Sequence, residues 1–337
     1  MTASRNPKHL GFLIFPGFPM ACLTSAIEPL RAANEITGQR AFRWSVLSES
    51  GARVASSAEV VFDPTMALSG ATGLDYLFFL SSPSGWFEGP KKALAELRWL
   101  ARQGVGMGGF SGGIFPLVRA GLMDGHAVSV HWCYEAAFKA EFPEIDARSA
   151  VMSIDQSRMT AAGATAVFDL MLKLIEDDLG PEIMTEVACW FQHPVVRGPD
   201  VTQRTPGYRA DRTQDMLPQA VAQAIRLFSD NIEEPLAIAD VAREVGVSPR
   251  QLDRSFRSST GQAPLRYYRM IRMKKARQLV QFSDESLTSV ALSVGYASST
   301  PMVRHYVEEF GLSPQADRAA RNSFREKGTE PRFAAQS

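Results

Sequence analysis

An internal repeat in the last third of the chain places the strongest constraint on its fold. Five positions that begin at Ile238 recur 49 residues later, from Leu287 onward, and five more that begin at Leu252 recur 50 residues later, from Met302 onward. The first set pairs Ile238, Val241, Ala242, Val245 and Gly246 with Leu287, Val290, Ala291, Val294 and Gly295. The second set pairs Leu252, Arg254, Phe256, Gly261 and Pro264 with Met302, Arg304, Tyr306, Gly311 and Pro314. Such self-similarity indicates one supersecondary unit that occurs twice.

Each copy has the pattern of two short helices joined by a glycine turn. In the first copy, an i, i+3, i+4, i+7 spacing predicts one buried helical stripe made of Ile238, Val241, Ala242 and Val245. Gly246 can end this helix with a positive φ, and Ser248 can cap the next helix, which begins with a proline. The second copy has the same order, with Gly295 at the turn and a cap at Ser298 or Ser299. This order is typical of a helix-turn-helix (HTH) motif.

A basic stripe accompanies the first copy, although the whole chain has a formal net charge of zero. Between positions 250 and 277, nine Lys and Arg residues occur with Asp253 as the single acidic residue. We interpret the stripe as a phosphate footprint, because the alternative, a solvated helix face, usually contains interspersed acids. The second helix of each copy is expected to enter the major groove of double-stranded DNA. The side chains predicted to address DNA are Arg250, Gln251, Asp253 and Arg254 in the first copy and Ser299, Thr300, Val303 and Arg304 in the second.

The segment between the two copies predicts one longer helix from Pro264 to Phe282. Its 19 residues would span about 28 Å, close to the rise of about 34 Å for one DNA turn. One chain is therefore expected to place two recognition helices in successive segments of the major groove.

Residues from about 219 to 318 resemble the AraC-type DNA-binding domain. The resemblance lies in the stretches ADVAREVGVSPRQLDRSF, RYYRMIRMKKARQLV and SVALSVGYASSTPMVRHYVEEFGLSP. It implies an all-α domain with two HTH units, which we assign to residues 216–318, followed by a flexible tail over 319–337. One departure is Pro301 inside the second recognition helix, where a proline is tolerated only in the first turn.

The first part of the chain alternates between short apolar runs and longer helical patterns. Strands are predicted at Leu10–Phe15, Phe42–Leu47, Leu74–Leu80, Val105–Gly109, Ala127–Val130 and Ala150–Ile154. Helices are predicted at Ala21–Glu35, Pro90–Gln103, Gly112–Ala120, Trp132–Glu141 and Ala164–Leu179. This alternation predicts an α/β domain with a mainly parallel sheet sandwiched by helices.

A G-x-S-x-G motif over residues 109–113 follows a predicted strand and opens a predicted helix, which is the context of a nucleophile elbow. His131 follows Ser111 by 20 residues, so a hydrolase or amidase that uses this pair is the alternative function. In an α/β-hydrolase, however, the histidine comes late, after an acidic residue. The later histidines are His193, near the end of the domain, and His305, inside the DNA-binding unit. The order therefore disfavours an enzyme.

A second resemblance accounts for the elbow. The stretches GFLIFPGFPMACLTSAIEPLRAAN, GGFSGGIFPLVRAGLMDGHAVSVHW and SIDQSRMTAAGATAVFDLMLKLIEDDLG resemble the amidotransferase-like domain of the DJ-1/PfpI superfamily, in the version fused to AraC-type domains in GlxA-family regulators. It covers residues 8–193. Enzymatic relatives carry cysteine where this chain has Ser111, and the segment 16–22 lacks the acidic residue that they place near the nucleophile. We therefore expect no catalytic residue, cofactor or metal.

The elbow is instead expected to bind a ligand, because exposed backbone N–H groups at a helix start attract a carboxylate. The predicted ligand-binding residues are Phe110, Ser111, Gly112, His131, Trp132 and Glu28. Three of them have a structural alternative: His131 as a hydrogen-bonded core histidine, Trp132 as a core residue, and Glu28 as a cap or ion-pair partner. The resemblance implies an amine or amino-acid-derived effector, as in regulators of arginine, glycine betaine or carnitine catabolism. It also implies an activator that dimerises through this domain. Phe110 and Trp132 would offer cation–π surfaces to a quaternary amine.

The remaining features indicate a cytoplasmic protein. The first apolar run is broken by Pro16 and Pro19, which is unlike a secretory signal, and no stretch approaches the about 20 apolar residues of a membrane span. The three cysteines, Cys22, Cys133 and Cys189, are odd in number and widely spaced, which argues against disulfides and a zinc site. Residues 194–215 contain several prolines and arginines and are expected to form a mobile linker. A constitutive DNA-binding protein whose first domain only dimerises is a third possibility.

Overall fold

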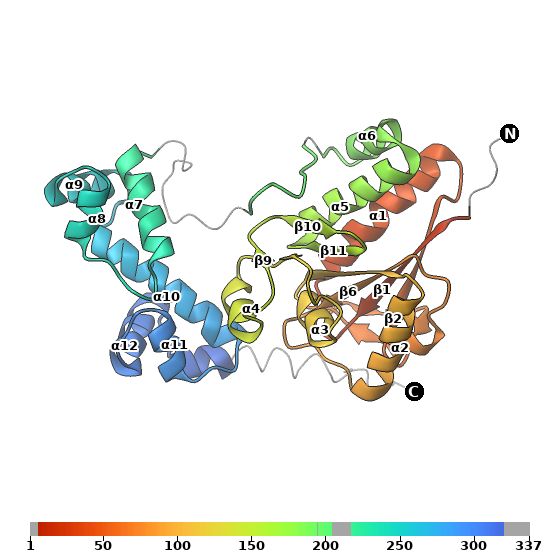
Figure 1. Ribbon diagram of the computed structural model, residues 1–337, viewed down its shortest axis with the longest axis horizontal. Helices are drawn as coiled ribbons and strands as arrows, with labels where there is room; N and C mark the ends of the chain where they lie inside the picture. The colour runs from red at the N-terminus through yellow and green to blue at the C-terminus, as the bar shows by residue number, and fades with distance from the viewer. Residues whose placement is uncertain (1–5, 194, 204–216, 320–337) are drawn as a thin grey trace, which may run out of the picture. The chain divides into compact units, whose positions relative to one another are not determined.

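The computed structural model describes residues 6–193, 195–203 and 217–319, which belong to two compact units (Figure 1). Among these residues, the first unit runs to Gln203, and the second begins at Leu217. Of the helices in these ranges, none combines the length and the apolar character that crossing a bilayer requires.

The first unit is built on a seven-stranded sheet with the order β10-β11-β7-β6-β1-β2-β5. The strands are β1 (Lys8–Ile14), β2 (Phe42–Ser48), β5 (Met66–Ala67), β6 (Tyr76–Ser81), β7 (Gly106–Ser111), β10 (Met152–Asp155) and β11 (Arg158–Ala161). All neighbouring strands are parallel except β10 and β11, which form an antiparallel pair. The predicted parallel α/β sheet is confirmed.

Helices cover both faces of this sheet (Figure 1). Helices α1 (Met20–Thr37), α5 (Ala164–Leu179) and α6 (Pro181–Trp190) pack on one face, and α2 (Pro90–Arg102), α3 (Ile114–Arg119) and α4 (Glu135–Glu141) on the other. Adjacent strand residues point to opposite faces, so Phe12 and Phe78 belong to the first core and Leu13 and Phe79 to the second. Both faces of the strands are therefore apolar, as a doubly covered sheet requires.

Several elements differ from the sequence prediction. The strand predicted at 127–130 shrinks to β8 (Val128–Ser129), which pairs outside the main sheet with β9 (Ala147–Arg148). The place beside β7 is taken by β11, a four-residue strand too short for its alternation to be recognised. A small hairpin of β3 (Val54–Ala55) and β4 (Val61–Phe62), the 3-10 helix η1 (Leu68–Gly70) and helix α6 were also not predicted. Helix α3 is shorter than expected because residues 112 and 113 remain in the turn after β7.

Over the described residues 217–319, helices are the regular secondary structure of the second unit, and they include the two predicted HTH units. Its helices are α7 (Gln219–Asp230), α8 (Ile238–Glu244), α9 (Pro249–Thr260), α10 (Pro264–Phe282), α11 (Leu287–Ser293) and α12 (Ser299–Phe310), followed by a helical segment over 314–319. In the first half, the rings of Phe228 and Tyr268 stack with centroids 4.2 Å apart. In the second half, Met302 and Tyr306 are fully buried. Helix α10 has the predicted bounds, and Pro301 is the third residue of α12, within the first turn.

Part of the expected linker belongs to the first unit. The Val151 amide donates a 2.7 Å hydrogen bond to the Val201 carbonyl, and Thr202 forms an antiparallel bridge with Ala150. Arg197 makes a 2.6 Å ion pair with Asp169, whose side chain is fully buried in α5. Residues 195–203 are therefore held by specific bonds, in contrast to the mobile connector expected there. The rest of the linker, 204–215, and the predicted tail beyond residue 319 lie outside the described residues.

Candidate nucleic-acid interface and elbow site

Helix α9, the first predicted recognition helix, begins with a capping box. The Ser248 hydroxyl accepts a 3.3 Å hydrogen bond from the Gln251 amide, and the Gln251 side-chain oxygen accepts a 2.9 Å bond from the Ser248 amide. Pro249 occupies the first helical position, as predicted, and Gly261 ends the helix with a φ of 71°. The helix start is fixed by its own sequence, which holds the residues near it in a defined orientation.

The two faces of α9 differ sharply. Leu252 and Phe256 are fully buried, whereas Arg250 and Arg254 are exposed. The one acidic residue of α9, Asp253, accepts a 2.8 Å hydrogen bond from Arg257 one turn later. The outer face therefore presents guanidinium groups, the side chains that best bind phosphate oxygens and guanine edges.

The corresponding face of α12 is less charged. Thr300 and Arg304 are exposed, and Ser299 and Val303 are half-buried. Arg304 lies 3.9 Å from Glu308, a loose surface pair. The second helix can contribute one cation, two hydroxyls and an apolar contact, which suits looser base reading than the first helix allows.

The structure corrects the interpretation of the basic stripe, because three of its nine cations serve the packing of the second unit. Arg272 donates 2.7 Å hydrogen bonds to the carbonyls of Val294 and Gly295 in the turn after α11. Arg277 makes a 2.6 Å ion pair with Asp317. Lys274 is partly buried, and desolvation lowers its pKa to about 7. The footprint available to DNA is therefore smaller than the sequence predicts.

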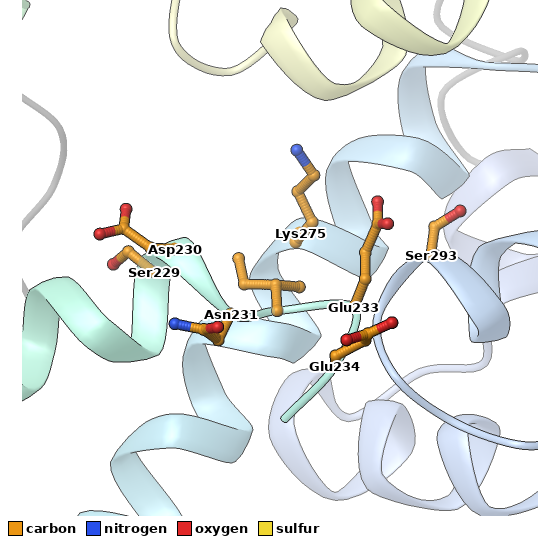
Figure 2. Close-up of a pocket in the computed structure, with 8 residues that line it drawn as sticks. Ser229, Asp230, Asn231, Glu233, Glu234, Lys275 and Ser293 are labelled. Atoms are coloured by element: carbon orange, nitrogen blue, oxygen red, sulfur yellow. The ribbon is translucent and has the colours of Figure 1, made fainter. Parts of the chain in front are cut away.

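A polar hollow of about 330 Å³ lies elsewhere on the second unit, at the turn after α7 (Figure 2). It is lined by Ser229, Asp230, Asn231, Ile232, Glu233, Glu234, Lys275 and Ser293. Figure 2 shows its three carboxylates pointing in different directions around the turn. These carboxylates outnumber the single ammonium group of Lys275, so the charge of the hollow disfavours phosphate.

The elbow of the first unit lies at the carboxyl edge of the sheet. Ser111 ends β7 with a φ of 54°, a strained conformation for a residue with a side chain. It is in register with Ser81 at the end of β6, and the turn 16–19 follows β1 at the same edge. Gly112 fits against this edge so tightly that a Cβ there would lie 2.5 Å from the Ser81 carbonyl oxygen.

His131 lies at this edge as well. Ala161 is in register with Phe110, so Gly163 continues beside the elbow, and a Cβ on Gly163 would lie 3.4 Å from the His131 ring. The His131 Nδ1 atom is 2.9 Å from the Cys133 sulfur, and burial lowers the pKa of His131 below 6.5. The rings of Trp132 and Tyr134 have centroids 5.5 and 5.6 Å from that of His131. These three partly exposed rings form an aromatic cluster, the residues 131, 132 and 134.

The proton relay of a serine hydrolase is not assembled here. In the described part of the chain, the Ser111 hydroxyl makes no hydrogen bond, and the Nδ1 atom of His131 bonds to Cys133. A serine hydroxyl without a hydrogen-bonded base is a poor nucleophile. The described residues of the elbow therefore combine a strained strand end with a serine hydroxyl that no base contacts by a hydrogen bond.

The side chains of two predicted ligand residues have structural partners instead. The Phe110 side chain is fully buried and stacks on Phe78 with centroids 4.6 Å apart, so the expected cation–π role of its ring is wrong. Since the ring points into the core between the sheet and α1, only its backbone lies at the elbow. Glu28 lies in the middle of α1 and forms a 3.0 Å ion pair with Arg31, the alternative foreseen for it.

Comparisons with known proteins support the assignment of the helical unit and extend it to most of the chain. A family model described as a helix-turn-helix domain matches residues 241–320. The HTH-type transcriptional regulator GbdR of Pseudomonas aeruginosa is 34% identical over 94% of this chain and 85% of its own length. The HTH-type transcriptional regulator GlxA of Rhizobium meliloti is 33% identical over 92% of this chain and 95% of its own. The chain belongs to this family of HTH-type transcriptional regulators. A solved AraC-family regulator from Pseudomonas putida, 26% identical, covers 55% of this regulator and 100% of its own chain with a TM-score of 0.50.

Sequence reasoning missed two residues that organise this HTH-type regulator. Arg272 was assigned to the DNA surface, yet its guanidinium lies over the Tyr296 ring, 4.2 Å from the centroid. Gln203 was assigned to the linker, yet its side chain bonds to the backbone on both sides of His131. No local pattern marks either residue, because their partners are 22 to 73 residues away in the chain.

Proposed function

We propose that this HTH-type regulator is a transcription activator controlled by a small effector that binds at the carboxyl edge of the first unit. The observation that carries the proposal is the strand order. From β1 the chain adds strands toward one edge of the sheet, and from β6 it adds them toward the other edge. Ligands of open α/β sheets bind outside the carboxyl ends of the strands at such a switch point, here between β1 and β6. The turn 16–19, the segment after Ser81 and the Ser111 elbow all border this point.

The residues at this edge favour an amine or amino-acid-derived effector. The aromatic cluster offers π faces to a quaternary or protonated amine. The Ser111 hydroxyl and the elbow amides, including that of Gly112, suit a carboxylate. Helix α3 has only six residues, so its dipole adds little, and the hydrogen bonds would provide most of the recognition.

On the DNA side, we propose that α9 supplies most of the affinity and base selection through Arg250, Gln251 and Arg254, with Asp253 orienting Arg257. Helix α12 adds Ser299, Thr300, Val303 and Arg304. We further propose that the regulator acts as a homodimer in the cytoplasm, where promoter DNA lies. A light-scattering mass of two chains is the expected result.

Calorimetry tests the effector class. The full chain is titrated with glycine betaine, L-carnitine and L-arginine, and one of them is expected to bind in the micromolar to millimolar range. Trp132→Ala should weaken that binding at least about tenfold, because it removes a desolvated cation–π contact. Trp99→Ala, at a 43% exposed residue of α2, should not. If none of the three compounds gives heat, the proposed effector class is wrong. If no metabolite changes transcription from the target promoter, a constitutive regulator is favoured instead.

The rival function is hydrolysis at Ser111, and one observation favours it: the strained φ that places an elbow hydroxyl at the sheet edge. This function predicts turnover of p-nitrophenyl acetate that Ser111→Ala abolishes. We expect no turnover above that of Ser111→Ala, because His131 does not contact the hydroxyl.

A further inference from the structure

Gln203, the last described residue of the first unit, holds the segment that carries the aromatic cluster. Its side-chain nitrogen donates hydrogen bonds of 2.7 Å to the Val130 carbonyl and 2.9 Å to the Ala150 carbonyl. Its side-chain oxygen accepts a 2.9 Å bond from the Trp132 amide. Every hydrogen-bonding group of the amide side chain is engaged with backbone. These four residues are called the Gln203 clamp.

Backbone bonds support the clamp. The Gln203 amide donates a 2.9 Å hydrogen bond to the Ser149 carbonyl, and Val201 accepts one of 2.7 Å from Val151. Residues 201–203 thus run beside 149–151 like an added strand, with Thr202 and Ala150 as a bridge pair. The described residues of the second unit begin at Leu217. The side chain of Gln203 therefore links the segment 130–132 directly to the part of the chain that leads on to the DNA-binding helices.

We infer that Gln203 is a positioning residue that couples the effector site to DNA binding; the effector end of this inference rests on the function proposed above. A movement of residues 130–132 that closes the aromatic cluster on an amine cannot leave all three side-chain bonds intact. It must either carry Gln203 with it or release it. The bound and the released state of Gln203 supply the two-state element that coupling between distant sites requires.

Coupling is reciprocal, so DNA alone tests it without knowledge of the effector. The full chain is mixed with a duplex selected for tight binding from a library of genomic fragments, and hydrogen–deuterium exchange is followed by mass spectrometry. In the wild type, DNA should change the exchange rates of peptides covering 128–134 and 149–151 by about fivefold or more. In Gln203→Leu, which keeps the size of the side chain and removes its bonds, the change should fall below about twofold.

Controls separate coupling from folding. Gln39→Leu alters an exposed glutamine of the same unit and should behave like the wild type. If Gln203→Leu lowers the melting temperature, Gln203→Glu provides the second test: it keeps an acceptor for Trp132 and loses both donors, so it should also lose the DNA-induced change. The inference is overturned if DNA does not change the exchange rates of these peptides in the wild type. It is also overturned if Gln203→Leu or Gln203→Glu keeps the full DNA-induced change. If the calorimetric titrations give no heat but DNA still changes the exchange rates, the proposed effector class is wrong and the inference about Gln203 stands.

Discussion

The side chains of Ser248 and Gln251 close a capping box at the start of α9 through two reciprocal hydrogen bonds of 3.3 and 2.9 Å. Gln251 thereby uses its oxygen for folding, while its side-chain nitrogen makes no hydrogen bond within the described residues. Gln251 can therefore cap the helix with its oxygen and still offer its side-chain nitrogen to DNA.

Substitutions at Gln251 should separate these roles. Gln251→Glu retains the box and loses the N–H donors, so the free energy of unfolding of the second unit should stay within about 0.5 kcal/mol while DNA binding weakens by about 1–3 kcal/mol. Gln251→Ala should lose both, with a drop in unfolding free energy of about 0.5–1 kcal/mol. Circular dichroism at 222 nm and gel retardation measure the two effects. Unchanged DNA binding in Gln251→Glu would assign this residue to capping alone.

Arg250 and Arg254 should bind phosphates or base edges. The double change Arg250→Ala/Arg254→Ala should reduce the slope of log affinity against log salt by about 0.9 for each DNA phosphate that the variant no longer neutralises. Arg226→Ala, at an exposed arginine on α7, is the matched control and should leave the slope unchanged. Retention of promoter fragments that is insensitive to the double change would contradict the assigned interface.

Arg272 should act on stability and leave the salt slope alone. Arg272→Ala removes two charge-assisted hydrogen bonds to Val294 and Gly295, so the second unit should lose about 3 kcal/mol of unfolding free energy. Arg266→Ala, at an exposed position of the same helix, should change it by less than about 0.5 kcal/mol. Equal effects in thermal unfolding would show that Arg272 is an ordinary surface cation.

Ser111 should be a site of stored strain. Ser111→Gly should raise the unfolding free energy of the first unit by about 0.5–1 kcal/mol, because relief of a positive φ exceeds the extra entropy of a glycine. Ser57→Gly, at an exposed residue without positive φ, should lower it. All five tryptophans lie before residue 191, so tryptophan fluorescence during urea unfolding follows the first unit alone.

Acidification should destabilise the first unit. Burial lowers the pKa of His131 and His9 below the 6.5 of an unfolded histidine, so the unfolded chain takes up protons that the folded unit does not. The unfolding free energy should therefore fall as the pH drops below about 6.5. His131→Gln should flatten this dependence in urea titrations followed by tryptophan fluorescence. His305→Gln, in the second unit, should leave it unchanged, and a slope of equal steepness in both variants would exclude His131 as a source.

The sequence by itself determined the features that depend on near neighbours. The spacing of apolar residues, the Ser248 cap and the glycine turns are local signals, which is why both HTH units were predicted, and helix Pro264–Phe282 with its bounds. The α/β alternation likewise predicted the parallel sheet and placed Ser111 at a strand end. Only tertiary structure decided the rest, because it depends on which distant segments meet. Phe110 faces the core, Arg272 turns inward and Gln203 bonds to residues 53 to 73 positions earlier in the chain. A side chain's direction follows from the backbone that surrounds it, and no run of neighbouring residues encodes that environment.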